Sequence, residues 1–158
     1  MESTGEVVSH VTQAFVDLVR VETRLYTAAS ARLRADLGLS LGQFEFLDII
    51  ERTPNCRVLD IAAEVAITVG AVSKGVDRLA AAGWCERFAN PHDRRSSVLR
   101  LTESGQRILA ESRPVVEDEL AALTATIDPA ELTRVAATLA ALRETLEAGR
   151  HGEPGRGA

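Results

Sequence analysis

The chain has 158 residues, which is enough for one hydrophobic core of ordinary domain size. Its formal net charge of −5 does not by itself point to a nucleic-acid partner. No apolar run approaches the ~20 residues of a membrane span, and the first residues lack the basic and apolar regions of a secretory signal. Composition therefore excludes a membrane protein, and we expect a cytoplasmic one.

The N-terminal third of the chain is predicted to form two helices. Apolar residues recur at three- and four-residue spacings, or sums of these, from Val11 to Leu33, and this pattern indicates one long amphipathic helix that ends near Gly38. A second helix should begin at Ser40, because Gln43 three residues later completes a capping-box pattern.

Two short helices and a hairpin are predicted in the middle of the chain. Apolar spacing indicates a third helix over residues 58–65 and a fourth that Thr68 caps and Gly83 ends. The segment Asn90–Arg95 then lies between two short apolar runs and carries two adjacent arginines. A basic hairpin tip is a poor core element and a good contact for phosphate. A helix pair followed by a basic β-hairpin is typical of a winged helix-turn-helix.

Two long helices are predicted after the hairpin. Thr102 is placed to cap one that runs to about Thr126, and Asp128 followed by Pro129 begins the last. Leucine and valine follow a 3-4 spacing along this last helix, which predicts a seam that packs on another helix. The terminal helices exceed what a small winged domain needs. They indicate a dimer interface, although a self-contained helical bundle would give the same stripes.

The expected fold is therefore mainly α with a small β-hairpin wing and about six helices. Residues 39–102 would form a winged helix-turn-helix DNA-binding domain, and residues 1–38 with 103–148 a helical dimerisation domain. Residues 149–158, rich in Gly, Pro and Arg, are expected to be a disordered tail.

Charge is distributed unevenly along the chain. Residues 68–107 hold seven basic and four acidic side chains, whereas residues 108–148 hold three basic and eight acidic ones. A local basic patch matters more for DNA affinity than the overall charge does. Charge alone leaves open whether both regions are ordinary solvated helix faces.

A series of short motifs resembles one family closely. The run from 41 to 109 is similar to the DNA-binding core of the MarR family of bacterial transcription regulators, and the flanking helices fit that family's dimerisation domain. The motifs are Leu41-x-Gln43-Phe44, Leu59-x-Ile61-Ala62, Thr68-Val69-Gly70-Ala71-Val72-Ser73-Lys74, Val76-Asp77-Arg78-Leu79-x-x-x-Gly83, Asn90-Pro91-x-Asp93-Arg94-Arg95 and Leu99-x-Leu101-Thr102-x-x-Gly105. The resemblance implies a homodimeric transcriptional regulator, usually a repressor, on an inverted-repeat operator of double-stranded DNA.

The fourth helix and the wing supply the expected DNA contacts. Inward-facing apolar positions leave short or polar residues of the helix on its outer surface, where they can enter a major groove. Lys74, the single lysine of the chain, could donate to guanine or to phosphate, or could simply be solvated. The resemblance implies that Asp93 holds Arg95 for the minor groove and that Arg94 meets phosphate. The predicted DNA-binding residues are Thr68, Val69, Gly70, Ser73, Lys74, Asp93, Arg94 and Arg95.

A small-molecule effector is implied by the resemblance alone. Members of the family commonly bind small aromatic or phenolic anions between the dimer helices and the winged domain, which releases DNA. The candidate lining residues are Phe15, Tyr26, Phe44 and Trp84, with Phe46 beside them, although each could instead fill the core. A carboxylate ligand would need a nearby arginine, for which Arg20 and Arg24 are the candidates.

Other classes of site find little support in the sequence. The histidines and cysteines show no metal-ligand spacing, and we expect neither a metal nor another cofactor. Cys85 is predicted to be buried, whereas Cys56, in a loop, is expected to be exposed and is the sole candidate for redox sensing. No nucleophile–base pair or phosphate-binding loop indicates an enzyme.

The alternative function is a winged-helix architectural or protein-interaction module without sequence-specific readout. Gly75, where the family more often has a large apolar residue, has no explanation from the sequence.

Overall fold

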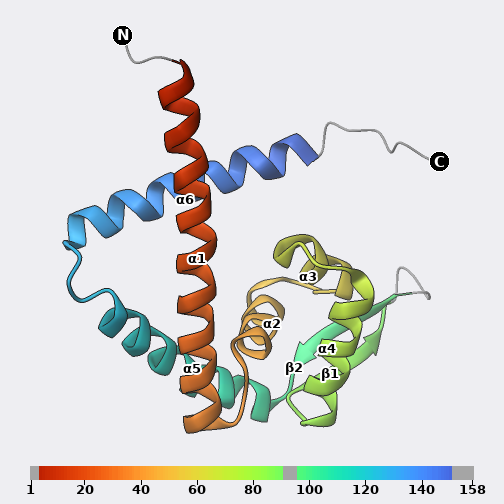
Figure 1. Cartoon of the computed structure of the whole chain (residues 1–158). Coiled ribbons are helices and arrows are strands. Elements are labelled where there is room, and N and C mark those ends of the chain that lie inside the picture. Colours follow the sequence, from red (N-terminus) through yellow and green to blue (C-terminus); the bar gives the residue numbers. More distant parts are fainter. Residues whose placement is uncertain (1–3, 91–95, 151–158) are drawn as a thin grey trace. The chain divides into compact units, whose positions relative to one another are not determined.

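The computed structural model describes residues 4–90 and 96–150. Within them lie six helices and one two-stranded antiparallel hairpin, which confirms the predicted fold class (Figure 1). In chain order the elements are α1 (Thr4–Leu37), α2 (Leu41–Arg52), α3 (Val58–Val65), α4 (Val69–Ala81), β1 (Cys85–Ala89), β2 (Ser97–Leu101), α5 (Glu103–Leu123) and α6 (Pro129–Arg150).

The chain divides into two compact units, Met1–Leu120 and Ala121–Ala158. The first contains all the elements from α1 to β2 together with most of α5, and the second contains α6. The functional division predicted above, into a winged domain and a dimerisation domain, remains a prediction.

Helix α2 is the centre of the first unit. It lies between α1 on one side and α3, α4 and the hairpin on the other (Figure 1). Four of its residues, Phe46, Leu47, Ile49 and Ile50, are buried in the core. Each buried side chain of this kind contributes about 1.5–3 kcal/mol relative to an exposed one. Because α2 contacts all of these neighbours, a displacement of α2 would also displace α4.

The predicted helix caps are present. The backbone N–H of Gln43 donates to Ser40 Oγ over 3.3 Å, and the Ser40 N–H donates to Gln43 Oε1 over 2.8 Å, so the capping box is complete. The Ala71 N–H donates to Thr68 Oγ1 over 3.3 Å at the start of α4. These bonds satisfy backbone donors that a helix N-terminus otherwise leaves without partners.

The junction between the hairpin and α5 explains the Leu-Thr-x-x-Gly motif. Thr102 Oγ1 donates to the Gly83 carbonyl over 2.6 Å and accepts the Gly105 N–H over 3.0 Å, as a helix cap. A Cβ placed on Gly105 would lie 1.9 Å from the carbonyl oxygen of Trp84. Glycine is therefore required at this position, because the start of α5 presses directly on the backbone that enters β1.

The last helix extends slightly further than the sequence indicated. The Ala130 N–H donates to Asp128 Oδ1 over 2.7 Å, which confirms the predicted cap. Gly149 and Arg150 were assigned to a disordered tail but belong to α6, which extends to Arg150. Residues 151–158, the rest of that tail, lie outside the described residues. No helix in the described part of the chain is long and apolar enough to cross a membrane.

Candidate nucleic-acid interface

Helix α4 presents its polar and small residues outward. Its inner positions, Val72, Val76 and Leu79, have no exposed surface, so the helix is anchored along one whole side. On the other side Val69 and Lys74 are exposed, and Val69 keeps 46% of its surface. Gly70 is also exposed and Ser73 is half-buried. Together with Thr68, these are the five positions of α4 and its cap that the sequence assigned to DNA.

Arg87 of β1 fixes the outer edge of α4, a role that the sequence did not reveal. Its guanidinium donates to Asp77 Oδ1 over 2.7 Å and reaches the carbonyl oxygen of Ser73 at 3.5 Å. The exposed carboxylate of Asp77 on α4 is thus paired with an arginine of the adjacent strand. This arrangement orients α4 and lowers the repulsion that Asp77 would exert on a phosphate.

The hairpin is attached firmly at its base. β1 and β2 pair along their whole length, from Cys85 opposite Leu101 to Ala89 opposite Ser97. On the other edge of β2, the Leu99 N–H donates to the Cys56 carbonyl over 2.7 Å. Asn90 Nδ2 donates to Ser96 Oγ over 2.9 Å, which closes the last described rung. The predicted wing contacts Asp93, Arg94 and Arg95 lie outside the described residues.

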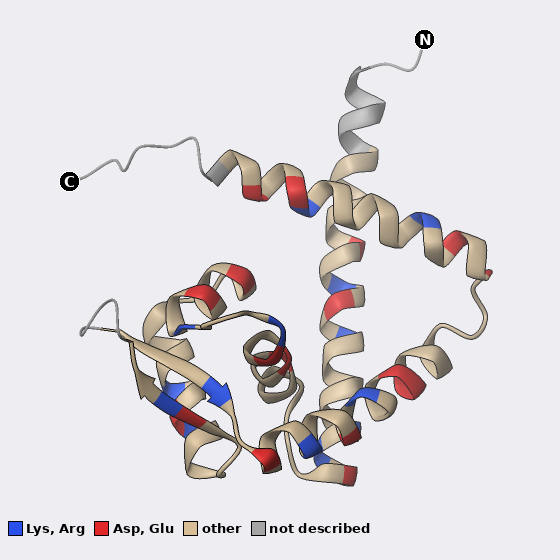
Figure 2. Ribbon diagram, turned by 180° about the vertical axis from the view of Figure 1, so that it is seen from behind, with Lys and Arg blue, Asp and Glu red and all other residues tan. Residues whose placement is uncertain are grey.

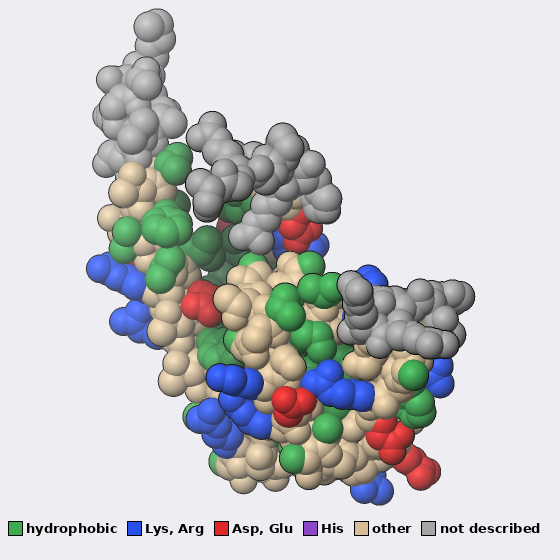
Figure 3. Space-filling view, turned by 90° about the vertical axis from the view of Figure 1, so that its right-hand side faces the viewer, with side chains coloured by type: hydrophobic (Ala, Val, Ile, Leu, Met, Phe, Trp, Pro, Cys, Tyr) green, Lys and Arg blue, Asp and Glu red, His purple; other side chains and the backbone are tan. Residues whose placement is uncertain are grey.

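Basic residues lie on α4 and on both strands of the hairpin (Figure 2), and basic side chains are spread over one face of the molecule (Figure 3). Four of them, Lys74, Arg78, Arg87 and Arg100, come from these three elements. Arg87 is paired with Asp77, and Arg100 lies over the Phe88 ring at 5.0 Å. Lys74 and Arg78 have no ion-pair partner among the described residues, so their charges are free for an external anion.

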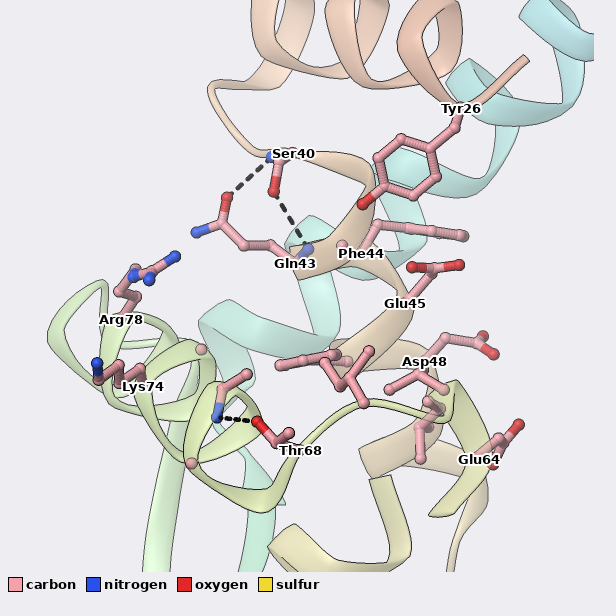
Figure 4. Close-up of a pocket in the computed structure, with 18 of the residues that line it drawn as sticks. Tyr26, Ser40, Gln43, Phe44, Glu45, Asp48, Glu64, Thr68, Lys74 and Arg78 are labelled. Atoms are coloured by element: carbon pink, nitrogen blue, oxygen red, sulfur yellow. Dashed lines mark hydrogen bonds between the residues drawn. The ribbon is translucent and has the colours of Figure 1, made fainter. Parts of the chain in front are cut away.

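A cavity of about 1200 Å³ opens beside α4 (Figure 4). Tyr26 of α1 and Phe44 of α2, two of the predicted effector residues, line it, and so does Phe46. Phe15 and Trp84 are not among its lining residues; Phe15 is 63% exposed, and Trp84 packs against the core. Lys74 and Arg78 of α4 lie at the opposite end from Tyr26 and Phe44 (Figure 4). A molecule in this space would therefore touch both the central helix and the fourth helix.

Gly75 makes the close approach of α2 and α4 possible. A Cβ on Gly75 would lie 2.4 Å from Cε2 of Phe46, well inside van der Waals contact. The Phe46 ring therefore occupies the space that any side chain at 75 would need. This packing supplies the reason for the glycine that the sequence left unexplained, and it joins α4 to the wall of the cavity.

Carboxylates rather than arginines accompany the aromatic end of the cavity. Glu22 and Glu45 both line it, and neither forms an ion pair within the described residues. Burial, and then the charge of Glu22, raise the pKa of the Glu45 carboxyl. Arg20 and Arg24, suggested above as partners of a carboxylate ligand, are not lining residues.

The remaining charges of the cavity wall belong to an ion-pair chain between helices. Arg52 pairs with Asp48 and with Glu64 of α3, and Arg113 of α5 pairs with Asp48 at 3.0 Å and with Glu51 at 2.6 Å. These pairs tie α5 to α2 and α2 to α3. The carboxylates of Asp48 and Glu64 are therefore paired with arginines, whereas those of Glu22 and Glu45 are not.

Both cysteines are buried. The expectation that Cys56 is exposed was wrong: its side chain has no exposed surface, because the loop folds inward and its carbonyl joins the edge of β2. Burial, and then the charge of Asp60, raise the pKa of the Cys56 thiol to about 11. A protonated, enclosed thiol is a poor nucleophile. Among the described residues no group of His, Cys, Asp and Glu has the arrangement of a metal site.

Comparisons with known proteins relate the middle of the chain to one family. The model of the MarR family matches residues 39–97. The multiple antibiotic resistance protein MarR of Escherichia coli strain K12 is 29% identical over 84 residues, which are 53% of this chain and 58% of that protein. The HTH-type transcriptional regulator BilQ of Clostridium symbiosum is 33% identical over 70 residues, 44% of this chain and 49% of its own. The chain thus spans about half the length of the curated relatives it matches.

A solved structure extends the similarity to most of the chain. The transcriptional repressor CouR, bound to a 23-mer DNA duplex, superposes with a TM-score of 0.76 and 25% identity. The match covers 90% of this chain and 99% of that one, so it includes helices on both sides of the winged domain.

Proposed function

The chain carries a MarR-family domain in residues 39–97, and from this premise we propose that it is a homodimeric, sequence-specific transcriptional repressor. The outward face of α4 is the observation that carries the proposal. It presents short side chains and one unpaired lysine on a helix whose other side is completely buried. A helix held in this way can enter a major groove about 12 Å wide without losing its position.

The wing would complete the contact with DNA. The described part of the hairpin is anchored by the pairing of β1 with β2 and by the bond from Leu99 to Cys56. Arg95 would enter the minor groove, Asp93 would hold it, and Arg94 would meet the phosphate backbone. On this assignment Arg87 is a positioning residue, because it fixes α4 through Asp77.

Exposed apolar side chains on the terminal helices support a homodimer. Val11 and Phe15 of α1 are 65% and 63% exposed, and α1 shows apolar side chains at its surface in Figure 3. Leu139, Leu142 and Leu146 form a similar exposed stripe on α6. Surfaces of this kind are typical of protein–protein contacts. Two copies related by a two-fold axis would present their α4 helices to half-sites about 34 Å apart, which requires an inverted-repeat operator.

The cavity beside α4 would hold a small aromatic effector. Its occupant would touch Phe46, which packs on Gly75 of α4. A ligand that moves this ring would shift the recognition helix relative to the wing, and thereby release DNA. Coupling of this kind requires that the ligand bind the DNA-free arrangement more tightly than the DNA-bound one.

Fluorescence anisotropy on DNA from directly upstream of the protein's own gene tests the proposal. The native duplex should bind tightly and a shuffled duplex weakly. We expect Arg95→Ala to lower affinity on both duplexes and to reduce the slope of log affinity against log salt by about 1. Lys74→Ala should cost about 1–3 kcal/mol on the native duplex if the lysine reads a base. Arg143→Ala is the control that removes an arginine from an element other than α4 and the hairpin, namely α6.

The assay also separates the alternative function. Equal and steeply salt-dependent binding to both duplexes would indicate an architectural protein. Wild-type affinity in both Arg95→Ala and Lys74→Ala would show that the assigned face does not contact DNA. Sedimentation equilibrium of wild type and Leu142→Glu tests the dimer, because a charge in the α6 stripe should shift the protein toward monomer.

A further inference from the structure

The aromatic end of the cavity has a definite shape and charge. Glu22 and Tyr26 lie one turn apart on α1 and therefore share a face of that helix. The Tyr26 hydroxyl lies over the backbone of Gly42, where an added Cβ would be 3.0 Å from it, so the ring crosses the start of α2. Phe44 and Glu45 follow on α2, and Figure 4 shows Tyr26, Phe44 and Glu45 together at one end.

The two carboxylates at this end have no ion-pair partner among the described residues, and the cation whose charge reaches the Tyr26 hydroxyl, Arg34, does not line the cavity. Asp48 and Glu64 farther along the wall are paired with Arg52, whereas Glu22 and Glu45 have no such partner. The negative potential they create is directed at the same space as the two aromatic rings. A carboxylate or phenolate ligand would be repelled there, and an organic cation would be attracted.

We propose that the cavity binds a small aromatic cation, an arylalkylamine whose ammonium group lies near Glu22 and Glu45 and whose ring packs on Tyr26 and Phe44. This inference rests on the proposed function, since it names the class of effector that the cavity would hold. An ammonium group gains twice at this place, from the carboxylates and from the faces of the aromatic rings. A volume of about 1200 Å³ admits a bicyclic ring with a side chain, and is larger than a single phenol needs.

The cations of the opposite end do not favour an anion at the aromatic wall. Lys74 and Arg78 are borne by α4, on the far side of the cavity from Tyr26 and Phe44 (Figure 4). Arg52 is held by its two carboxylate partners. An anionic ligand could pair with the cations of α4 but would make no contact there with the aromatic rings. An aromatic amine at the other end would contact both the carboxylates and the aromatic rings.

Titration calorimetry with two probes of similar shape and opposite charge tests this inference. Tryptamine and indolepropionate are titrated separately into the full-length protein without DNA. We expect tryptamine to bind at least about tenfold more tightly, as expected for charge-assisted contacts. Glu45→Gln and Glu22→Gln should each weaken tryptamine binding several-fold, while Glu111→Gln, at an exposed position of α5, should leave it unchanged.

Equal or tighter binding of indolepropionate, or the absence of tryptamine binding, would overturn the inference. Unchanged tryptamine affinity in both glutamine variants of the cavity would overturn it as well. The wild-type preference between the probes needs no variant, so a variant that fails to fold does not prevent a decision. Because ligand binding is measured without DNA and operator binding without ligand, failure of this inference and failure of the proposed function are seen separately.

Discussion

Substitution of Gly75 by alanine tests how tightly α2 and α4 are packed. The new Cβ would lie 2.4 Å from Cε2 of Phe46 and 3.1 Å from Cδ2, whereas ordinary contact begins at 3.4 Å. The ring must therefore move by about 1 Å, and Phe46 is only 8% exposed, so core neighbours oppose the movement. Overpacking of this kind costs about 1–3 kcal/mol, and the better helix propensity of alanine returns about 1 kcal/mol. We expect a net loss of roughly 0–2 kcal/mol.

The chain supplies a matched control on the same helix. An added Cβ at Gly70 meets no heavy atom within 4 Å, so Gly70→Ala should stabilise α4 by about 0.5–1 kcal/mol without steric cost. Urea unfolding of both variants at one protomer concentration gives the two free energies of unfolding. Gly75→Ala should be the less stable of the two by about 1–3 kcal/mol.

A double mutant separates contact from propensity. Replacing Phe46 by leucine shortens the side chain that opposes position 75, so Gly75→Ala should cost less in the Phe46→Leu background than in wild type. The difference is the coupling energy between the two positions. If Gly75→Ala stabilises the protein as much as Gly70→Ala does, or if the cycle shows no coupling, the proposed packing of Phe46 on α4 is wrong.

Three further outcomes follow from the described contacts. Gly105→Ala should lower the free energy of unfolding by roughly 3 kcal/mol or more, because its Cβ would lie 1.9 Å from the Trp84 carbonyl oxygen and the start of α5 would have to move away from the backbone at Trp84. The loss would be seen as a lower urea midpoint, and wild-type stability would contradict the described junction. Lys74 is the single lysine, so it is the one side-chain amine that an amine-reactive reagent can label, and peptide mass spectrometry distinguishes it from the N-terminal amine. Operator DNA should protect Lys74 from the reagent, and equal labelling of its peptide with and without DNA would remove it from the interface. The thiol of Cys56 should be inert to Ellman's reagent at pH 8 until urea unfolds the protein. Since folding raises its pKa from 9.0 to about 11, the native state keeps its proton longer, and stability should fall as pH rises from 9 to 11; rapid native-state labelling would show that the thiol is accessible.

The positions of the helices could be predicted from the sequence because short-range interactions determine them. Ser40 with Gln43 and Thr68 with Ala71 form their hydrogen bonds within one turn, so the residues that make each bond are neighbours in the chain. The same holds for the inward stripe of α4, which follows from the helical period alone. The basic hairpin was also recognisable, because its residue types and its position after a helix pair are local features.

Only the tertiary structure decided which residues distant in the chain contact one another. Phe46 and Gly75 belong to different helices, and nothing in the spacing of either helix shows that one ring fills the place of a missing side chain. Arg87 and Asp77 are ten positions apart, on a strand and a helix whose relative orientation sets their ion pair. Cys56 was expected to be exposed because it follows a turn, yet its burial depends on β2 arriving beside it. Glu22 and Glu45 meet at one cavity end for the same reason: periodicity specifies which face of a helix is apolar, whereas packing determines which faces meet.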